Sequence, residues 1–448
     1  MKKLFIVAYG GGHINIQLEV ARQFSNEGWE VVFLSTPNTT STLKAIGKYR
    51  YYTFKDLLEE ESRNYGKLLI DEIHNNHLID YDESLAYGGV NYKNLVEIYG
   101  EERANNLYKS FGRRIFLPIN SIKKLLDIEK PDLVSVTLSA ARAERAAIIA
   151  AKERDIKVMA IEDLFGTACA FSIYDNLHVK NSKTKQLLID KGVPEERINL
   201  ISTIQNNFQV PSFHTTINEY IGITYKYVPD YIFCINSYAK KQLVERGIPE
   251  EVIYEVGQPS LDKIFENYSN LIDIEKEKMI LVTTQPLDSC YDFLELINPV
   301  LMELSKENYK VIIRYHPSTN GELERQYFGN YSSNIVISRS ENLYELLAKV
   351  SLLITQTSTT AIESGIFNTK TLSLALGNDN FISFEEAGIA KSLNNPTKKE
   401  VYNTVISLLD TNDSHCYNWG LTYCDGRSSK RIYQVIKETK IEKKEKVD

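Results

Sequence analysis

VIIRYHP (Val311–Pro317) and, after a polar gap, LLITQTSTT (Leu352–Thr360) are the two pieces of sequence that decide the fold. Each is an apolar run that ends in a polar loop, as a buried parallel strand does. Open α/β sheets bind ligands outside the carboxyl ends of their strands, so we expect both loops at one edge of a sheet. The second loop also opens a helix, whose free backbone N–H groups favour an anion. The two loops therefore predict a site for a nucleotide monophosphate or diphosphate.

Strand-like and helix-like segments alternate along this second half of the chain. Such alternation predicts a mostly parallel sheet with right-handed crossovers. The predicted strands are Met279–Pro286 with its loop, Lys310–Tyr315, Ile335–Ser338, Leu352–Thr355 and Thr371–Leu376, and the predicted helices are Asp262–Lys278, Phe293–Glu307, Leu343–Lys349 and Thr360–Ile366.

The chain opens with a second α/β pattern. A short apolar strand, Lys3–Tyr9, ends in Gly10-Gly11-Gly12-His13, and an amphipathic helix follows to about Glu27. The loop is not GxGxxG, and no acidic residue closes the next strand, Glu30–Ser35, which argues against a dinucleotide fingerprint. The start still predicts a Rossmann-like half. It continues with strand Pro131–Thr137, helix Ala141–Arg154 and strand Ile156–Glu162.

These patterns predict an α/β fold of two Rossmann-like domains that face each other across a cleft. Residues 1–260 form the first domain, with a helical, tyrosine-rich insertion near 55–127, and residues 261–425 form the second. Residues 426–448 hold a last helix, Ser428–Glu438, that crosses back to the first domain, and a charged tail. The segment Asn181–Ser202 resembles Asn236–Gly257 as an internal echo, and both predict strand, helix, turn and strand.

Composition narrows the class of protein. At 448 residues the chain is too long for one ordinary domain. Its net charge of −7 argues against a nucleic-acid partner, and five scattered cysteines without a CxxC pair favour a reduced, cytoplasmic protein. The apolar run at the N-terminus stops after six residues, too few for a signal peptide. No stretch approaches a transmembrane length, so any membrane contact is expected to be peripheral, at the inner face.

Several residues at the predicted strand ends are candidates for phosphate binding. Hydroxyls and N–H groups of Ser358, Thr359 and Thr360 suit a phosphate, and Glu363, one turn into the helix, suits a ribose hydroxyl. The alternative is a capping box, Thr360-x-x-Glu363, that needs no ligand. The other candidates are His316 as a phosphate donor, Pro317 that stops the strand, Arg314 on the same strand face, and Gln285 after the first strand of the domain.

The candidate catalytic residues lie in the first half. Gly11 and Gly12 let a backbone approach a ligand closely, and His13 is a general base if its pKa lies near neutral. The adjacent carboxylates of Glu162 and Asp163, at another strand end, are the competing base candidates. Asp80-Tyr81-Asp82 matches a DxD metal motif but lies in the irregular insertion, so we expect no metal.

The residues quoted above resemble GT-B glycosyltransferases of the bacterial surface-glycan type. His316-Pro317 and Ser358-Thr359 are similar to the HP and Ser/Thr motifs of bacterial sialyltransferases and capsule polymerases, which implies phosphate contacts there. Gly10–His13 is similar to the loop of muropeptide and glycolipid transferases, which implies that His13 lies near an acceptor. Those sialyltransferase-type enzymes carry an acid-acid-glycine motif that supplies the base; here two extra residues stand between Asp163 and Gly166.

The resemblance implies a metal-independent glycosyltransferase in surface-glycan or polysaccharide biosynthesis. It would move a sugar from a nucleotide sugar, UDP-linked by preference and CMP-linked otherwise, to a hydroxyl of a glycan, glycolipid or glycoprotein. The nucleotide sugar is a substrate, and no cofactor is expected. UDP-sugar 2-epimerases share the fold and similar phosphate loops and are the first alternative. A nucleotide- or glycan-binding protein without catalysis is the second.

Overall fold

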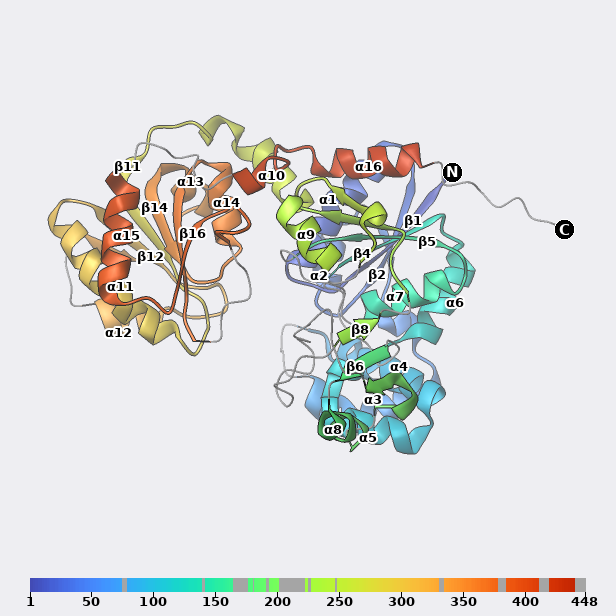
Figure 1. The fold of residues 1–448 in the computed structure, drawn as a ribbon. Helices are drawn as coiled ribbons and strands as arrows, with labels where there is room; N and C mark the ends of the chain where they lie inside the picture. Colours follow the sequence, from blue (N-terminus) through green and yellow to red (C-terminus); the bar gives the residue numbers. More distant parts are fainter. Residues whose placement is uncertain are drawn as a thin grey trace. The chain divides into compact units, whose positions relative to one another are not determined.

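The computed structural model describes residues 1–74, 79–138, 142–163, 176–179, 181–190, 193–200, 222–224, 227–245, 248–329, 334–377, 384–410 and 419–439. The chain divides into two compact units (Figure 1). The first unit comprises Met1–Cys234, Ala239–Ser260 and Ser429–Asp448, and the second comprises Ile235–Tyr238 and Leu261–Ser428.

The second unit is built on a six-stranded sheet, and the pairings between its described strands are all parallel. The spatial order is β13-β12-β11-β14-β15-β16, which is the 3-2-1-4-5-6 order of a doubly wound sheet. The strand order reverses between β11 and β14. The strands are β11 Glu277–Thr283, β12 Lys310–Arg314, β13 Ile335–Ile337, β14 Val350–Thr355, β15 Lys370–Ala375 and β16 Lys391–Asn394.

Helices cover both faces of this sheet (Figure 1). Helices α11, α12 and α15 pack into one apolar core with alternate side chains of the strands, and α13 and α14 lie on the opposite face. The bounds are α11 Cys290–Lys306, α12 Glu322–Phe328, α13 Leu343–Lys349, α14 Thr360–Ile366, α15 Lys398–Asp410 and η7 Trp419–Leu421.

The first unit repeats this plan around a parallel seven-stranded sheet. Its order, β10-β9-β5-β4-β1-β2-β3, reverses between β1 and β4. The strands are β1 Lys3–Ala8, β2 Glu30–Ser35, β3 Arg50–Tyr52, β4 Leu133–Thr137, β5 Lys157–Ile161, β9 Tyr231–Cys234 and β10 Ile253–Glu255, and the helices are α1 Gly12–Asn26, α2 Thr40–Ile46, α6 Ile119–Glu129, α7 Ala143–Lys152 and α9 Ser237–Glu245, with η5 Glu250–Val252. The predicted α/β class with two Rossmann-like halves is confirmed.

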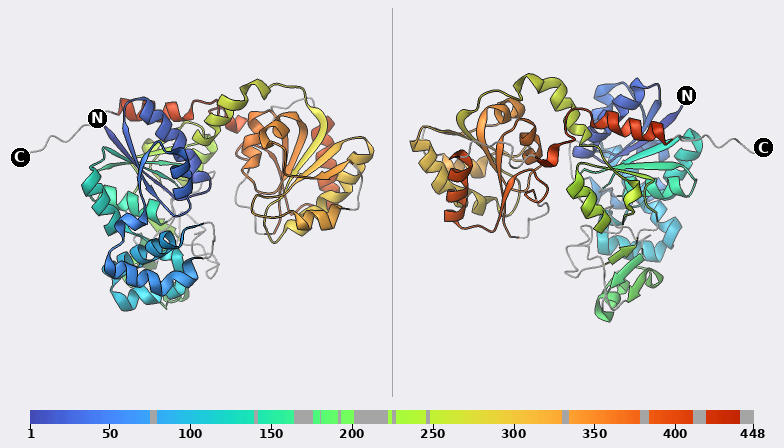
Figure 2. Two further views of the ribbon diagram at one scale, coloured as in Figure 1. Left: turned by 180° about the vertical axis from the view of Figure 1, so that it is seen from behind. Right: turned by 45° about the horizontal axis from the view of Figure 1, so that its top comes forward.

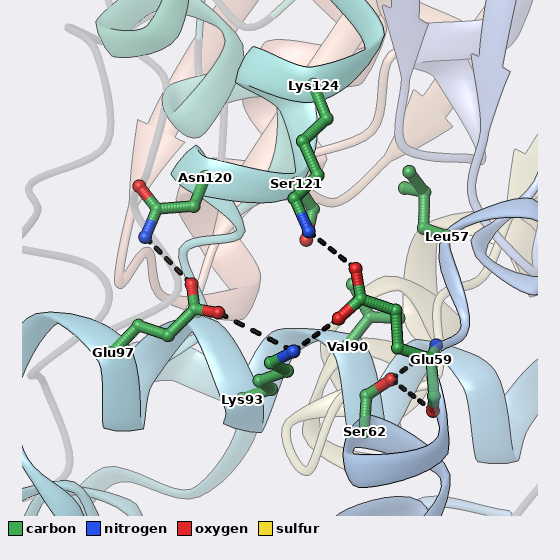
Figure 3. A pocket seen from close by; sticks show the side chains of 9 residues that line it. All are labelled: Leu57, Glu59, Ser62, Val90, Lys93, Glu97, Asn120, Ser121 and Lys124. Atoms are coloured by element: carbon green, nitrogen blue, oxygen red, sulfur yellow. Dashed lines mark hydrogen bonds and ion pairs between the residues drawn. The ribbon is translucent and has the colours of Figure 1, made fainter.

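A group of helices is inserted between β3 and β4. An ionic network joins three of them, because Lys93 on α4 and Lys124 on α6 both contact the Glu59 carboxylate at the start of α3 (Figure 3). The Ser62 hydroxyl accepts from the Glu59 N–H and donates to the Glu59 carbonyl, both at 2.8 Å. The bounds are η1 Phe54–Leu57, α3 Glu60–Ile73, α4 Tyr81–Tyr99, α5 Glu101–Phe111 and η2 Gly112–Ile115.

The two echoed segments share their element order but not their sheet. The second copy forms α9, η5 and β10, and β10 joins the seven-stranded sheet beside β9, the strand that precedes this copy. The first forms a separate sheet in the order β7-β6-β8, in which β6 and β8 are antiparallel. The bounds are β6 Asn176–Val179, α8 Ser182–Asp190, η3 Glu195–Arg197, β7 Ile198–Leu200 and β8 Gly222–Thr224.

The last helix, α16 (Ser428–Glu438), belongs to the first unit (Figure 2). Ile432 and Ile436 are buried in its core, and Tyr433 meets Phe24 of α1 edge to face at 5.2 Å.

The helix predicted over Asp262–Lys278 is shorter in the structure. Helix α10 covers Pro259–Tyr268, then η6 covers Ser269–Leu271, and Glu277 already pairs in β11. No helix in the described part of the chain is long and apolar enough to cross a membrane.

Candidate active site

The first unit places its chemical groups where its strand order reverses. Strands β1 and β4 are neighbours. The carboxyl end of β1 leads into the loop before α1, and β4 ends at Thr137. Gly10 and Gly11 of that loop have φ of 146° and 57°, which side chains with a Cβ rarely adopt. The loop thus turns sharply enough to start α1 at Gly12 and to bring His13 to the end of β4.

His13 bridges two buried carboxylates. Its Nδ1 lies 3.0 Å from Glu144 Oε2, and its Nε2 lies 3.1 Å from Asp163 Oδ2. Thr137 Oγ1 donates to Glu144 Oε1 at 2.7 Å and lies 2.6 Å from His13 Nδ1. The side chains of Glu144 and Asp163 are 0% and 6% exposed, so both interactions are shielded from water. The cluster is an acid–histidine–acid chain.

This cluster keeps His13 charged. Burial of the ring opposes the imidazolium, but the charge of Glu144 and the hydrogen bond to Asp163 outweigh burial and raise the pKa of His13 to about 11. A base function for His13 requires a pKa near neutral, and the structure does not meet this condition. At neutral pH His13 holds a proton, and a carboxylate beside it is the group able to accept one.

The two acids at the end of β5 differ in their surroundings. Asp163 faces His13, whereas Glu162 is 2% exposed with its backbone fixed in the sheet edge, since its N–H donates to Phe233 and its carbonyl accepts from Gln258. The glycine of the acid-acid-glycine comparison, Gly166, lies outside the described residues.

Sequence reasoning missed Glu144 and Thr137. Glu144 is in the first turn of α7, within a run that reads as an ordinary amphipathic helix. Its position could have indicated it, because Glu144 lies in the first turn of the helix that follows β4, the strand beside β1. A helix N-terminus at a strand end faces the ligand side of the sheet.

In the second unit the loop with Gln285 and the Ser358 loop meet where the strand order reverses. Thr283 at the end of β11 donates to Thr355 at the end of β14 at 2.7 Å. Gln285 Nε2 donates to the Thr357 carbonyl at 3.2 Å, which ties the two loops together. A cavity of about 360 Å³ lies beside Gln285, lined also by Cys290, Asn320 and Glu324 among others. This volume is within the range of small-molecule sites.

The Ser358 loop does not form the capping box that was the alternative to a phosphate site. Ser358 Oγ accepts from the Thr360 N–H at 3.3 Å and donates to Thr360 Oγ1, while Thr359, the N-cap residue of α14, makes no side-chain capping bond. Glu363 is largely buried, and burial raises the pKa of its carboxyl to about 7. The raised pKa favours the protonated form near neutral pH, and a protonated carboxyl can donate to a hydroxyl.

His316 is held as a hydrogen-bond donor. Its Nδ1 accepts from the Ser318 N–H at 3.1 Å, so in the neutral ring the proton sits on Nε2. Burial and the nearby Arg339 lower the pKa of His316, which keeps the ring neutral at pH 7. Arg339, which sequence reasoning missed, donates to the carbonyl of Pro317 at 3.3 Å.

Arg314 is tied to the backbone. It donates to the Glu341 carbonyl at 2.9 Å, and burial together with Arg339 lowers its pKa. The ends of β12 and β13 thus carry two guanidinium groups beside His316. Positive charge at strand ends suits an anion.

Comparison with known proteins identifies the family. A family model described as UDP-N-acetylglucosamine 2-epimerase matches residues 212–437, half of the chain. A curated UDP-N,N'-diacetylbacillosamine 2-epimerase (hydrolyzing) from Legionella pneumophila is 23% identical over 283 residues, 56% of this chain and 70% of that protein.

Two solved structures show the same fold. UDP-GlcNAc 2-epimerase from Neisseria meningitidis, bound to UDP-GlcNAc, is 13% identical with a TM-score of 0.53 and covers 98% of this chain and 100% of its own. The glycotransferase of kitacinnamycin is 11% identical with a TM-score of 0.55 and covers 98% of each chain. At these identities the structures show the fold alone, and that fold serves both reactions.

The family match corrects the function expected from sequence. Glycosyltransferase activity in polysaccharide biosynthesis, the first reading, is wrong, because the matching family is one of epimerases and the Legionella relative is also an epimerase. The phosphate loops that suggested a transferase are shared between the two classes, so they could not separate them. The chain belongs to the UDP-N-acetylglucosamine 2-epimerase family.

Proposed function

We propose that this protein is a nucleotide-sugar 2-epimerase that acts on a UDP-linked sugar. The observation that carries the proposal is the acid–histidine–acid chain of Asp163, His13 and Glu144. These residues lie at the carboxyl ends of β1, β4 and β5, and the strand order reverses between β1 and β4. This is where a doubly wound sheet is expected to bind its ligand. Epimerisation needs proton transfer to and from carbon and no acceptor molecule, and this chain of groups is suited to moving a proton.

Inversion at C2 of a nucleotide sugar removes a proton from one face of the carbon and returns one to the other. C2 has no adjoining carbonyl, so its proton becomes removable as the diphosphate leaves C1. The C–H electrons form a C1=C2 double bond, the C1–O electrons go to the diphosphate, and the proton goes to the base. Return of the diphosphate to C1 and of a proton to the opposite face of C2 gives the epimer.

We assign proton removal to Asp163, which is the carboxylate that contacts His13 Nε2. His13 stays charged and connects Asp163 to Glu144, so a proton can be exchanged between the two carboxylates through the ring. Water that attacks C1 in place of the diphosphate would release UDP and a free sugar. The description of the Legionella relative as hydrolyzing suits that outcome.

The second unit has its own candidate contacts for a nucleotide phosphate. His316 has its Nε2 proton available as a donor, and the hydroxyls of Ser358, Thr359 and Thr360 lie at the start of α14, whereas the Ser358 and Thr360 N–H groups already donate within the loop. Because charge develops on the diphosphate as C1–O breaks, donors fixed at that position lower the barrier. Glu363, with a pKa near 7, is assigned to a ribose hydroxyl.

The test is solvent exchange without acceptor. The protein is incubated in D₂O with UDP-N-acetylglucosamine and, separately, with its C6-carboxylate counterpart, and the C2 proton is followed by NMR. We expect an epimer, or its hydrolysis products, with deuterium at C2 from one of them. Asp163→Asn should slow exchange at least about 100-fold, while Asp71→Asn, an exposed acid on α3, should not.

Binding of UDP without exchange or UDP release from either sugar would contradict the epimerase proposal. It would favour the non-catalytic nucleotide-binding alternative. Full activity in the Asp163→Asn variant would instead show that the proton is removed elsewhere.

A further inference from the structure

The cavity beside Gln285 lies within the second unit and is not used by the proposed chemistry. Its walls come from the loop between β11 and α11, from the start of α11, and from the loop and first turns of α12 (Figure 1). Of the described residues that line it, none is a candidate phosphate contact of the His316 or Ser358 loops. The cavity is therefore a separate candidate for a ligand.

One wall of this cavity includes a buried acid, Glu324. The residue is 3% exposed and lies in the first turn of α12, where the helix dipole favours a negative charge. Among the residues that the structure describes, its carboxylate accepts one hydrogen bond, from the Thr284 hydroxyl, and forms no ion pair. A carboxylate removed from water without a counter-charge is costly, so buried carboxylates are normally paired. Glu324 lacks the positive partner that its charge requires.

The surroundings of Glu324 bring further negative charge to the cavity. The described lining contains no lysine, arginine or histidine, and the exposed Glu322 is a second acid in it. Arg325, the next residue on α12, donates to the Asn320 carbonyl and lies over the Tyr315 ring, 5.7 Å from the centroid. This nearby guanidinium is engaged by those two residues and leaves the Glu324 charge uncompensated.

The rest of the lining includes apolar surface. Cys290 is 6% exposed, and burial together with the charge of Glu324 raises the pKa of its thiol to about 11, so the thiol stays neutral at pH 7. Pro286, Leu287 and Leu323 line the cavity as well. A volume of about 360 Å³ with carbon-rich walls and one uncompensated, buried carboxylate suits a small organic cation.

We propose that this cavity binds a primary amine, whose ammonium group pairs with Glu324 and whose carbon chain lies against Leu287 and Leu323. The ammonium supplies the missing positive charge through a charge-assisted hydrogen bond. The inference does not depend on the epimerase function, because it uses none of the residues assigned to that reaction. An inorganic cation is the other source of the same charge.

The experiment compares two probes of matched shape, hexylamine and hexanol, on the full chain. Binding is followed by NMR of the Leu287 and Leu323 methyl groups. We expect hexylamine to bind about 10- to 100-fold more tightly than hexanol, the scale of a charge-assisted hydrogen bond. Glu324→Gln should remove this preference. Glu307→Gln, which removes the same charge from an exposed residue at the other end of α11, should leave it unchanged.

Three outcomes would overturn the inference. The first is equal affinity of the native protein for both probes, and the second is a preference for hexylamine that survives in Glu324→Gln. The third is displacement of hexylamine by KCl with saturable shifts of the same methyl signals that Glu324→Gln abolishes, which would assign the site to an inorganic cation.

Two measurements without the probes complete the test. The melting temperature of Glu324→Gln should equal or exceed that of the native protein, because the variant removes an uncompensated buried charge. A lower melting temperature would show that the protein already compensates the carboxylate. UDP affinity in this variant, measured by calorimetry, should stay within about twofold, and a larger fall would assign the cavity to the nucleotide. Either result would overturn the amine site, whereas absence of C2 exchange would overturn the epimerase function alone.

Discussion

Removal of the Glu129 carboxylate should destabilise the first unit. Glu129 ends α6 and accepts four hydrogen bonds: two from Arg50, at 2.6 and 2.7 Å, one from Lys3 at 2.8 Å and one from Tyr52 at 2.5 Å. Its side chain is 3% exposed. These contacts hold the edge strand β3 and the start of β1 to the end of α6, at the amino ends of the strands and away from the candidate active site.

The lowered pKa of Glu129 gives the size of its contribution to the free energy of unfolding. The Arg50 hydrogen bonds are the largest cause, and with Lys3 and Tyr52 they outweigh burial and lower the pKa from 4.5 to about 2. Each pKa unit corresponds to about 1.4 kcal/mol, so the charged carboxylate adds roughly 3 kcal/mol at neutral pH. Arg50 is 48% exposed, and solvent screening reduces this, so we expect about 2 kcal/mol for Glu129→Gln.

The pH dependence has a definite sign. Because folding lowers the pKa of Glu129, its contribution to the free energy of unfolding is complete above pH 4.5. The contribution is lost as the pH falls towards 2. The free energy of unfolding of Glu129→Gln should therefore lie below that of the native protein at pH 7, and the gap should narrow by roughly 40% at pH 3.5.

Urea unfolding at the two pH values is the assay. The chain has two tryptophans, and Trp419→Phe leaves Trp29 of the first-unit core as the fluorescent reporter. Glu27→Gln, an exposed acid after α1, is the control and should stay within about 0.5 kcal/mol. A gap for Glu129→Gln below that control level, or one that widens as the pH falls, would refute the reasoning.

Three further results are expected. The ring protons of His13 should show no titration by NMR between pH 5 and 9, because its pKa is about 11; a midpoint near 6.5 would contradict the cluster. His316→Ala should weaken UDP binding, measured by calorimetry, by about 1–3 kcal/mol, and unchanged affinity would contradict the phosphate assignment. Lys276 Nζ donates to the carbonyls of Ala348 and Phe367, so Lys276→Met should destabilise the second unit by about 2 kcal/mol, seen as faster hydrogen exchange in α13; unchanged exchange would contradict this.

The second unit was predictable in outline because its local signals agree. Short apolar runs, helical spacing and polar strand ends give its parallel alternation, and two helices, Leu343–Lys349 and Thr360–Ile366, have the predicted bounds. The helix predicted over Asp262–Lys278 was too long because Glu277 and Lys278 belong to strand β11, which pairs with β14. The local sequence pattern does not show this long-range pairing. Strand β3 was missed for the same reason, as its three residues are defined by β2 beside them.

The sequence singled out two residues of the candidate active site, His13 and Asp163, but not Glu144. His13 stood out because it follows three glycines at a strand end, and Asp163 because it ends a strand. Glu144 did not, since nothing in ARAERAAIIAAKER separates a catalytic acid from a solvent-facing one. The condition set for His13 as a base, a pKa near neutral, depends on Glu144, which local sequence did not single out. The choice of transferase over epimerase turned on loops that both classes use to hold phosphate.

The place of α16 sets a constraint on how the chain is made. Phe24 and its neighbours on α1 are covered by Tyr433 and Ile436, residues that leave the ribosome only after the whole second unit. The nascent first unit must therefore wait with an uncovered apolar strip on α1, although a domain at the start of a chain can otherwise fold during synthesis. A chain that stops before Ser428 would keep that strip open, a surface on which chaperones or other nascent copies can act.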